Sequence, residues 1–226
     1  MIFSTMTQAE AVPKPSVDCT LYLVTDRSLL GGRDLARIVR AAIVGGVTMV
    51  QLREKELPAR EFVQVARQLL AITRPTRVPL IINDRVDVAL AVGADGVHVG
   101  QDDIPADMVR RIIGPDKILG VTAHDEHELA VAVTHGADYV GTNAVFGTPT
   151  KADIRPPIGL DGLARRYAGA TVPVVAIGGI DHENAADAIE AGADGVAVVR
   201  AIMAAPDTAR AATDLRLTVG EALAHR

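Results

Sequence analysis

Two cations and an amide alternate in the segment Gln51-Leu52-Arg53-Glu54-Lys55, which directly follows an apolar run. In an extended chain every second side chain points to the same side, so Gln51, Arg53 and Lys55 would share one face. A guanidinium offers a fork of donors to phosphate oxygens, and an ammonium group adds a second positive charge. This spacing indicates a site for a diphosphate or triphosphate. A solvated loop, in which Glu54 pairs with Lys55, is the competing interpretation because surface pairs are common.

Carboxylates follow two other apolar runs, with Asp84 after Leu80–Ile82 and Asp103 after Gly96–Val99. Taken singly, each is better explained as the N-cap of the helix expected after it. If the two runs are adjacent strands, however, both carboxylates reach one point. Mg²⁺ prefers one or two carboxylates plus the oxygens of a substrate phosphate. The pair is therefore a candidate magnesium site, with helix capping as the alternative.

Hydroxyl groups and a lysine gather in the loop after the apolar run Tyr139–Thr142, at Thr148, Thr150 and Lys151. Glycine and proline frame this loop, which is typical of an anion clamp or a mobile lid. A flexible solvated loop is the alternative interpretation. If the loop is a clamp, Lys151 would add a third cation to the diphosphate site.

Backbone amides offer a further anion site where the last two apolar runs end, at Gly178-Gly179 and at Val199-Arg200. In barrels of parallel strands, the loop after the seventh strand and the helix start after the eighth commonly bind a phosphate. We therefore expect two anion sites at one mouth. One would hold a monophosphate, and the other would hold a diphosphate beside the cations and the metal.

These residues lie at the ends of a repeated strand-and-helix pattern. Turn glycines, at Gly93, Gly136 and Gly192 in the phrase Gly-Ala-Asp, end a helix-like segment and precede an apolar run. Helices are expected to begin near Pro58, Pro105 and Asp181. The runs expected as strands are Leu21–Thr25, Val47–Leu52, Leu80–Ile82, Gly96–Val99, Ile118–Val121, Tyr139–Thr142, Val174–Ile177 and Gly195–Val199.

Alternating strands and helices predict parallel strands with right-handed crossovers, and eight such units close into an α/β fold of the (β/α)₈, or TIM, barrel type. An open doubly wound sheet is disfavoured because Thr25-Asp26-Arg27-Ser28, after the first strand, lacks a glycine-rich fingerprint. The length of 226 residues suits one domain. We expect a flexible N-terminal tail at 1–19 and a single catalytic barrel domain at 20–226.

Composition argues against several classes of function. Apolar runs stay shorter than the ~18 residues of a membrane span. The net charge of −5 and the aromatic content of 3% argue against a nucleic-acid partner. Cys19 is the one cysteine of the sequence, which is typical of a cytoplasmic protein, and metal motifs of the zinc type are missing from the sequence. On general frequencies we expect a homodimer.

The segment from Leu21 to Val199 resembles the thiamine phosphate synthase family, also called thiamine-phosphate pyrophosphorylase. The motifs that carry the resemblance are, in chain order, Leu21-Tyr22-Leu23-Val24-Thr25-Asp26, Gln51-Leu52-Arg53-Glu54-Lys55, Ile82-Asn83-Asp84-Arg85-Val86-Asp87, Gly96-Val97-His98-Val99-Gly100-Gln101-Asp102-Asp103, Thr148-Pro149-Thr150-Lys151 and Val175-Ala176-Ile177-Gly178-Gly179-Ile180.

The resemblance implies a transferase that joins 4-amino-5-hydroxymethyl-2-methylpyrimidine diphosphate to 4-methyl-5-(2-phosphoethyl)thiazole, giving thiamine phosphate and pyrophosphate. In this dissociative, magnesium-assisted substitution, pyrophosphate leaves a pyrimidine-stabilised cation that the thiazole nitrogen captures. The protein then needs to stabilise negative charge on the leaving group and needs no nucleophile of its own. The metal ligands implied are Asp84 and Asp103. The catalytic cations implied are Arg53, Lys55 and Lys151.

The same resemblance assigns the remaining contacts to substrate. Gln51 would face the pyrimidine. The diphosphate would bind to Arg53, Lys55, Asn83 and Lys151. The thiazole phosphate would bind to Thr148, Thr150, the Gly179 amide and the backbone near Val199.

The sequence departs from the family pattern at two positions. Thr122 stands where the family usually has serine, and we expect its hydroxyl to keep a substrate-binding role. Arg200 also replaces a usual serine, so its side chain either binds the phosphate or points outward and leaves backbone contacts. His98 either lines the pyrimidine pocket or is a structural residue of the barrel.

The main alternative is a thiazole tautomerase, a related barrel that isomerises the thiazole phosphate. That enzyme would need an acid–base group such as His124 and no pair of metal-binding carboxylates. Other phosphate-handling barrels, such as an aldolase with a lysine inside a strand, and a binding protein without turnover are less well matched.

Overall fold

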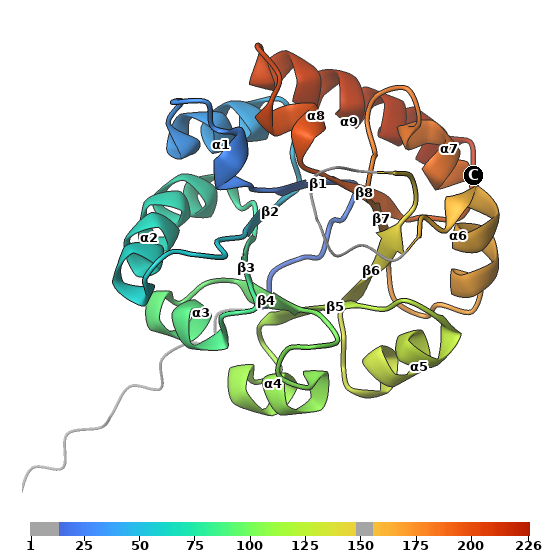
Figure 1. Ribbon diagram of the computed structural model, residues 1–226, viewed down its shortest axis with the longest axis horizontal. Coiled ribbons are helices and arrows are strands. Elements are labelled where there is room, and N and C mark those ends of the chain that lie inside the picture. Colours follow the sequence, from blue (N-terminus) through green and yellow to red (C-terminus); the bar gives the residue numbers. More distant parts are fainter. Residues whose placement is uncertain (1–13, 148–155) are drawn as a thin grey trace, which may run out of the picture.

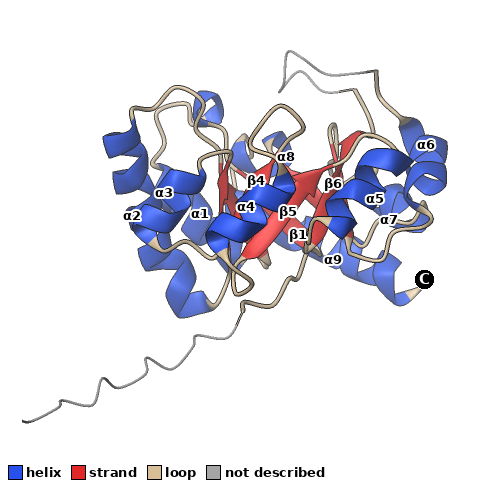
Figure 2. Ribbon diagram, turned by 90° about the horizontal axis from the view of Figure 1, so that it is seen from below, coloured by secondary structure: helices blue, strands red, loops and turns tan. Residues whose placement is uncertain are grey.

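The computed structural model describes residues 14–147 and 156–226. The described residues form a closed barrel of parallel strands in chain order, in which the first strand pairs with the last. Figure 1 looks along the barrel and shows the helices outside the ring of strands, and Figure 2 shows the same arrangement from the side. The predicted single-domain TIM barrel is thereby confirmed. The strands are β1 (Leu21–Val24), β2 (Met49–Leu52), β3 (Leu80–Asn83), β4 (Gly96–Val99), β5 (Ile118–Thr122), β6 (Tyr139–Ala144), β7 (Val174–Ile177) and β8 (Gly195–Val198).

Helices follow the strands and pack on the outside of the barrel. The side chains of Asp34, Asp125 and Asp207 accept hydrogen bonds from backbone N–H groups at the start of the first, fifth and ninth helices, which satisfies donors that the helix leaves unpaired. The helices are α1 (Leu35–Val44), α2 (Ala59–Thr76), α3 (Val86–Val92), α4 (Ala106–Ile113), α5 (Glu126–Thr134), α6 (Gly159–Tyr167), α7 (Ala185–Glu190), α8 (Arg200–Met203) and α9 (Thr208–Ala224), and a 3₁₀ turn covers Arg27–Leu29.

Two of the three predicted helix starts are correct. Pro58 and Pro105 directly precede α2 and α4. The predicted start at Asp181 is wrong, because α7 begins at Ala185. The Asp181 carboxylate instead accepts a hydrogen bond from the Glu183 N–H at 2.9 Å, which forms a local turn before the helix.

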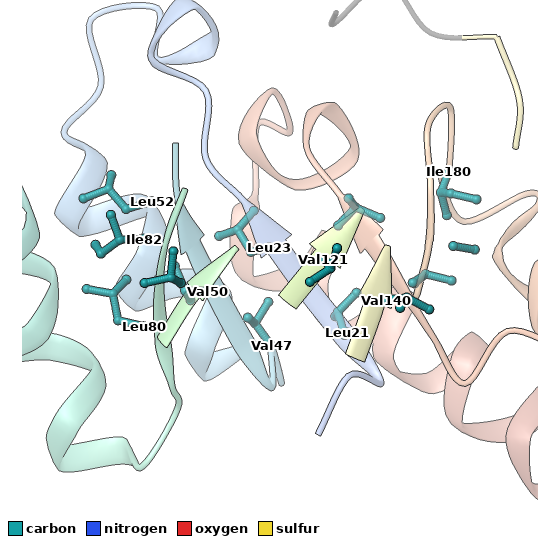
Figure 3. Packing of buried hydrophobic residues seen from close by; sticks show 14 of the residues in the cluster. Leu21, Leu23, Val47, Val50, Leu52, Leu80, Ile82, Val121, Val140 and Ile180 are labelled. Carbon is teal, nitrogen blue, oxygen red and sulfur yellow. The ribbon is translucent and has the colours of Figure 1, made fainter. Parts of the chain in front are cut away.

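The strands are apolar on both faces because each face is buried in a different layer. Side chains such as Leu21, Leu23 and Val50 point outward and pack under the helices, as Figure 3 shows. Burial of one such side chain stabilises a fold by roughly 1.5–3 kcal/mol. Tyr22 and Tyr139 belong to a separate cluster of buried residues that fills the inside of the barrel.

The chain segment before β1 packs against the inner cluster. Val17 contacts this cluster, and Cys19 belongs to it with 4% of its surface exposed. Gly195 of β8 makes room for this segment, since a Cβ there would overlap the Cys19 carbonyl oxygen. Val17 and Cys19 lie in the segment predicted as a flexible tail, 1–19, and the boundary at 19/20 stays a prediction. Across the described ranges, the helices are all too short or too polar to cross a membrane.

Candidate active site

Asp84 directly follows β3 and has an unusual backbone conformation. Its φ angle is +60°, in the left-handed region that side chains other than glycine rarely adopt. Such a conformation costs on the order of 1–3 kcal/mol and persists where surrounding contacts enforce it. Here the Asp84 N–H donates to the His98 carbonyl oxygen at 2.9 Å, which fixes the turn between β3 and α3. The strained turn aims the Asp84 carboxylate at Lys55 instead of at the start of the helix.

Lys55 forms an ion pair with Asp84, with 3.0 Å between Nζ and Oδ2. The Lys55 side chain is 56% exposed and the Asp84 side chain 25%, so the pair contributes little to stability. Glu54, the alternative partner of Lys55, instead binds Arg27 through two hydrogen bonds of 2.9 and 3.0 Å. The interpretation as a loop with a Glu54–Lys55 pair is therefore wrong. The helix-cap interpretation of Asp84 is also wrong, because Arg85 occupies the N-cap position of α3.

Asp103, after β4, lies beside Asp84 and Lys55. Its Oδ2 accepts a hydrogen bond from the Gly100 N–H at 2.8 Å, and α4 begins later, after Pro105. Partial burial raises the pKa of Asp103, and the neighbouring Asp84 carboxylate raises this pKa further, against the lowering effects of the Gly100 N–H and of Lys55. Asp103 is thus not a cap of α4. The structure brings together the two carboxylates and the lysine that the sequence placed at the ends of β2, β3 and β4.

Two adjacent carboxylates suit Mg²⁺, which takes one or two protein carboxylates and completes its shell with water and substrate phosphate oxygens. Within the described ranges, His, Cys, Asp and Glu do not gather in groups of three or more that would form an all-protein metal cage. A pair of carboxylates whose mutual repulsion raises a pKa is the arrangement that a divalent cation relieves. The residues present therefore fit a magnesium ion shared with a substrate.

Arg53 extends from the end of β2 next to this group. Its backbone N–H donates to the Thr25 Oγ1 at 3.1 Å, which ties the start of the loop to the end of β1. Within the described part of the chain, the Arg53 guanidinium makes no hydrogen bond or ion pair of its own. Lys55 thus lies close to two carboxylates at the mouth edge formed by β2, β3 and β4, and Arg53 precedes it by two residues at the end of β2. We call these four residues, Arg53, Lys55, Asp84 and Asp103, the charged side of the mouth.

A chain of hydrogen bonds crosses the inside of the barrel just below the mouth. Gln51 Nε2 donates to the Tyr22 hydroxyl at 2.8 Å, and the Tyr22 and Tyr139 hydroxyls are 2.8 Å apart. His98 Nδ1 lies 3.0 Å from the Tyr139 hydroxyl, and its Nε2 lies 2.9 Å from Thr122 Oγ1. The predicted residues Gln51, His98 and Thr122 are therefore linked to one another. His98 faces inward and is part of this chain.

Tyr22 and Tyr139 are the residues of this chain that the sequence analysis missed. Both are buried, at 2% and 0% exposed, and their rings pack edge to face with centroids 5.7 Å apart. Burial raises the pKa of both phenols above the ordinary value, so both hydroxyls stay protonated. Gly120 makes room for them, since a Cβ there would overlap the Tyr139 ring. The signal in the sequence was a pair of tyrosines inside otherwise aliphatic strands.

The opposite edge of the mouth consists of backbone. Gly178 and Gly179 follow β7 with φ angles of +92° and +67°. A Cβ on Gly178 would lie 2.5 Å from Ala144, and one on Gly179 would lie 2.6 Å from the Gly147 carbonyl oxygen. Only glycine fits this turn, because both the conformation and the space exclude a side chain. We call the turn at Gly178 and Gly179, together with Val199, the glycine side of the mouth.

Val199 occupies the N-cap position of α8, a single turn that starts at Arg200. Arg200 is exposed and, in the part of the chain that the structure describes, makes no hydrogen bond or ion pair through its side chain. The predicted phosphate ligands Thr148, Thr150 and the catalytic Lys151 lie outside the described residues. Asn83 is the last residue of β3 and is buried, with 7% of its surface exposed.

His124, the acid–base group of the alternative function, is held by α5. Its Nδ1 and its backbone N–H both lie 2.7 Å from Glu128 Oε2, within the first turn of the helix. This contact orients the imidazole toward its own helix. The contact between His124 and Glu128 is local and also stabilises the N-terminus of α5.

Comparison with known proteins agrees with this geometry. The family model of thiamine monophosphate synthase matches residues 21–202. A thiamine-phosphate synthase of Roseiflexus sp. (strain RS-1) is 51% identical over 219 residues, which are 97% of this chain and 93% of that protein. A thiamine-phosphate synthase of Chloroflexus aurantiacus is 54% identical over 203 residues, 90% of this chain and 94% of that protein.

A solved structure is also similar over most of the chain. It is a thiamine phosphate pyrophosphorylase from Pyrococcus furiosus, with a TM-score of 0.83 and 39% identity, and the match covers 91% of this chain and 98% of that one. The relatives carry the name of the synthase and not that of a tautomerase, so the alternative is not favoured. The match of the family model over most of the barrel and the identity of about half to these relatives show that the chain belongs to the thiamine monophosphate synthase family.

Proposed function

We propose that this protein is a thiamine-phosphate synthase that joins the pyrimidine diphosphate to the thiazole monophosphate and releases pyrophosphate. The observation that carries the proposal is the meeting of Lys55, Asp84 and Asp103 at one edge of the mouth. A leaving pyrophosphate gains negative charge as its bond to carbon breaks, and fixed cations close to it lower the barrier.

Each side of the mouth then has a distinct task. Arg53 and Lys55 bind the diphosphate oxygens, and Lys55 gives up part of its pairing with Asp84 when the substrate arrives. Asp84 and Asp103 would hold Mg²⁺, which neutralises charge on the diphosphate and supports its departure. Asn83 provides an amide beside the same oxygens. Lys151, from the loop after β6, adds a cation in this proposal.

Apart from Arg200, the groups that would hold the pyrimidine and the thiazole phosphate are neutral. The Gln51 carboxamide lies at the mouth end of β2 and would hydrogen-bond to the pyrimidine, with His98 lining the same pocket. The glycine side, with Gly179 and Val199, would bind the thiazole phosphate through backbone N–H groups. Thr148 and Thr150 would complete that phosphate site, and Arg200, which is exposed, would contact the phosphate from its edge. Thr122 would donate its hydroxyl hydrogen to a substrate oxygen.

The reaction itself needs no protein nucleophile. Departure of pyrophosphate leaves a cation that the pyrimidine ring stabilises, and the thiazole nitrogen captures it. The chain holds the two substrates in line and excludes water from the cation. Cys19, the one thiol, lies buried at the opposite end of the barrel, and burial raises its pKa to about 12, so it takes no part.

The test mixes the pure protein with both substrates and Mg²⁺ and follows thiamine phosphate and pyrophosphate. Equal amounts of both products, lost with EDTA and restored by added Mg²⁺, support the proposal. Exchange of thiazole isomers without pyrophosphate release contradicts it and favours the tautomerase. A homodimer and a cytoplasmic location are further predictions, which light scattering and cell fractionation test.

A further inference from the structure

In the hydrogen-bond chain Gln51–Tyr22–Tyr139–His98–Thr122, each group donates to the next one. The N–H group of Gln51, at the start of the chain, determines this direction. Gln51 Nε2 can only donate, so it fills a lone pair of the Tyr22 oxygen. Tyr22 has one hydrogen left, and the Tyr139 oxygen is 2.8 Å away. Tyr22 is 2% exposed, and an unpaired hydrogen there would be buried without water. Tyr22 therefore donates to Tyr139.

The same reasoning continues through the histidine. Tyr139 accepts from Tyr22, so its own hydrogen points to His98 Nδ1, 3.0 Å away, which must then be the unprotonated ring nitrogen. The proton of the neutral imidazole is on Nε2, which donates to Thr122 Oγ1 at 2.9 Å. Thr122 accepts this bond and keeps its own hydrogen for a partner at the mouth, where its side chain is half-buried.

We propose that Tyr22 and Tyr139 are positioning residues, whose hydroxyls fix the Nε2–H tautomer of His98 and thereby make Thr122 a hydrogen-bond donor to the anionic substrate. They act through His98 and Thr122 and touch no substrate. At the other end of the chain, the bond from Gln51 Nε2 to Tyr22 leaves the Gln51 carboxamide oxygen as the group that faces the pyrimidine side. The part of this inference that concerns turnover rests on the proposed function.

The packing around the chain supports a fixed arrangement. The His98 ring stacks on the Tyr139 ring with centroids 5.6 Å apart and an angle of 29° between the planes. Gly120 leaves the space that the two rings occupy, because a Cβ there would overlap Tyr139 Cζ and lie 2.5 Å from His98 Nδ1. The stacked rings therefore pack closely against each other inside the barrel. Burial also raises the pKa of both tyrosines, so the donors of the chain are not lost by ionisation.

The first test reads the tautomer of His98 directly and is independent of activity. Protein labelled with ¹⁵N at histidine is studied by long-range ¹H–¹⁵N correlation, and a His98→Asn variant assigns the signals among the six histidines. We expect a protonated Nε2 and an unprotonated Nδ1 that accepts a hydrogen bond. In Tyr139→Phe, the Nδ1 signal should move toward that of a free unprotonated nitrogen. A proton on Nδ1 in the unchanged protein overturns the inference. The hydrogen bonds would then be donated in the opposite direction, from Thr122 through His98 to a Gln51 whose side-chain amide is flipped so that its oxygen accepts.

A matched control is the third tyrosine of the chain, Tyr167. Its buried hydroxyl donates to the Ala123 carbonyl oxygen, outside the hydrogen-bond chain. Tyr167→Phe also removes one buried phenol hydrogen bond, so it should lower the melting temperature as Tyr139→Phe does. It should leave the His98 signals unchanged. A similar shift of the His98 signals in both variants would show a general loosening and contradict the proposal.

The second test measures coupling in turnover. Thr122→Val removes the donor at nearly constant volume, and we expect kcat/KM to fall on the order of tenfold, whereas Thr122→Ser should retain activity. Tyr139→Phe should cost a few-fold alone and nothing further in the Thr122→Val background, because both changes remove the same donor. Additive losses would contradict the proposal even if the NMR result holds. An inactive but correctly folded protein with the expected tautomer would instead contradict the proposed function.

Discussion

In the proposed function, the two sides of the mouth would bind phosphate groups in different ways. The charged side uses Arg53 and Lys55 with the carboxylates Asp84 and Asp103, and it stores strain at Asp84. The glycine side uses the backbone after β7, where Gly178 and Gly179 exclude side chains. On the glycine side, fixed backbone N–H groups would bind a phosphate whose charge stays constant during the reaction. On the charged side, the cations and a magnesium ion would stabilise the charge that develops on the leaving group.

This difference between the two sides indicates which phosphate group would leave in the proposed reaction. On the charged side, the ion pair between Lys55 and Asp84 is exposed and weak, so a diphosphate can displace it easily. On the glycine side, close packing against Ala144 and Gly147 fixes the turn, and within residues 14–147 and 156–226 the turn has no ion pair that a substrate would displace. We therefore assign the leaving group to the charged side and the spectator phosphate to the glycine side. Variants on the two sides should change different kinetic constants.

The largest effect is expected for Asp84→Ala. Loss of this carboxylate removes a proposed metal ligand and the partner of Lys55, and we expect kcat/KM to fall by about 10³-fold. Steady-state assays over a range of Mg²⁺ concentrations measure this, and excess Mg²⁺ should restore only part of the rate. The matched control is Asp87→Ala, three positions along the chain. Asp87 is exposed and pairs with Arg85, which lowers its pKa, so its loss should leave the rate nearly unchanged.

Equal losses in Asp84→Ala and Asp87→Ala would contradict the comparison, since they would show that the rate depends on acidic residues near the start of α3 in general and not on the Asp84 carboxylate. The control also distinguishes chemistry from helix stability. Asp87 lies in the first turn of α3, where a carboxylate favours the helix, whereas Asp84 precedes the N-cap.

The next effect is expected for Lys55→Ala, with a fall in kcat of about 10²-fold and a smaller change in KM for the pyrimidine diphosphate. The reason is that the ammonium group interacts more strongly with the leaving pyrophosphate than with the bound substrate. Arg111→Ala is the control, because Arg111 forms an exposed pair of 3.1 Å with Asp107 on α4. A change confined to KM in Lys55→Ala would move Lys55 from a catalytic to a purely binding role.

A smaller effect with a different signature is expected on the glycine side. In Gly179→Ala the new Cβ would collide with the Gly147 carbonyl oxygen in a backbone conformation that alanine avoids. We expect KM for the thiazole phosphate to rise about tenfold, with little change in KM for the pyrimidine diphosphate. Gly32→Ala is the control, since Gly32 has φ of +80° but has open space around it. A rise in both KM values would show that the glycine side does not act as a separate site.

The sequence predicted the fold well because its signal is repeated. Each strand is buried on both faces, so each appears as a short continuous apolar run such as Leu80–Ile82 or Val174–Ile177. Once the runs are ordered as alternating strands and helices, adjacency follows, and with it the meeting of Asp84 and Asp103. The start of α7 was less predictable because Asp181 can initiate a turn as well as a helix.

The inside of the barrel was less predictable for the same reason that the strands were easy to find. A strand with two apolar faces shows no alternation, so the direction of Tyr22 or Tyr139 depends on the register of the closed sheet. The packing of Val17 and Cys19 was also invisible, since it depends on the gap that Gly195 leaves in β8. The assignments of Thr148, Thr150 and Lys151 stay predictions.

The smallest expected effect is on the thermal stability of the protein, and it tests the charged side of the mouth without substrate. Burial, then Asp84, raises the pKa of Asp103 in the folded protein above its ordinary value. Between the ordinary pKa, which applies to the unfolded state, and the raised pKa of the folded state, the native state binds more protons than the unfolded state. The free energy of unfolding therefore decreases as the pH rises from the first pKa to the second. Above this pH window the ionised Asp103 therefore lowers the stability of the metal-free protein. Asp103→Asn should raise the melting temperature slightly there and flatten its dependence on pH.

Differential scanning fluorimetry from acid to neutral pH measures this effect with EDTA and then with Mg²⁺. Mg²⁺ should raise the melting temperature of the unchanged protein at neutral pH, because it binds the ionised pair and neutralises the repulsion. It should raise that of Asp103→Asn much less. Asp107→Asn, which removes an exposed carboxylate of α4, is the control and should leave the response to Mg²⁺ intact. A lower melting temperature of Asp103→Asn in EDTA would show that its bond from the Gly100 N–H outweighs the repulsion by Asp84, and that Asp103 serves the turn more than the metal.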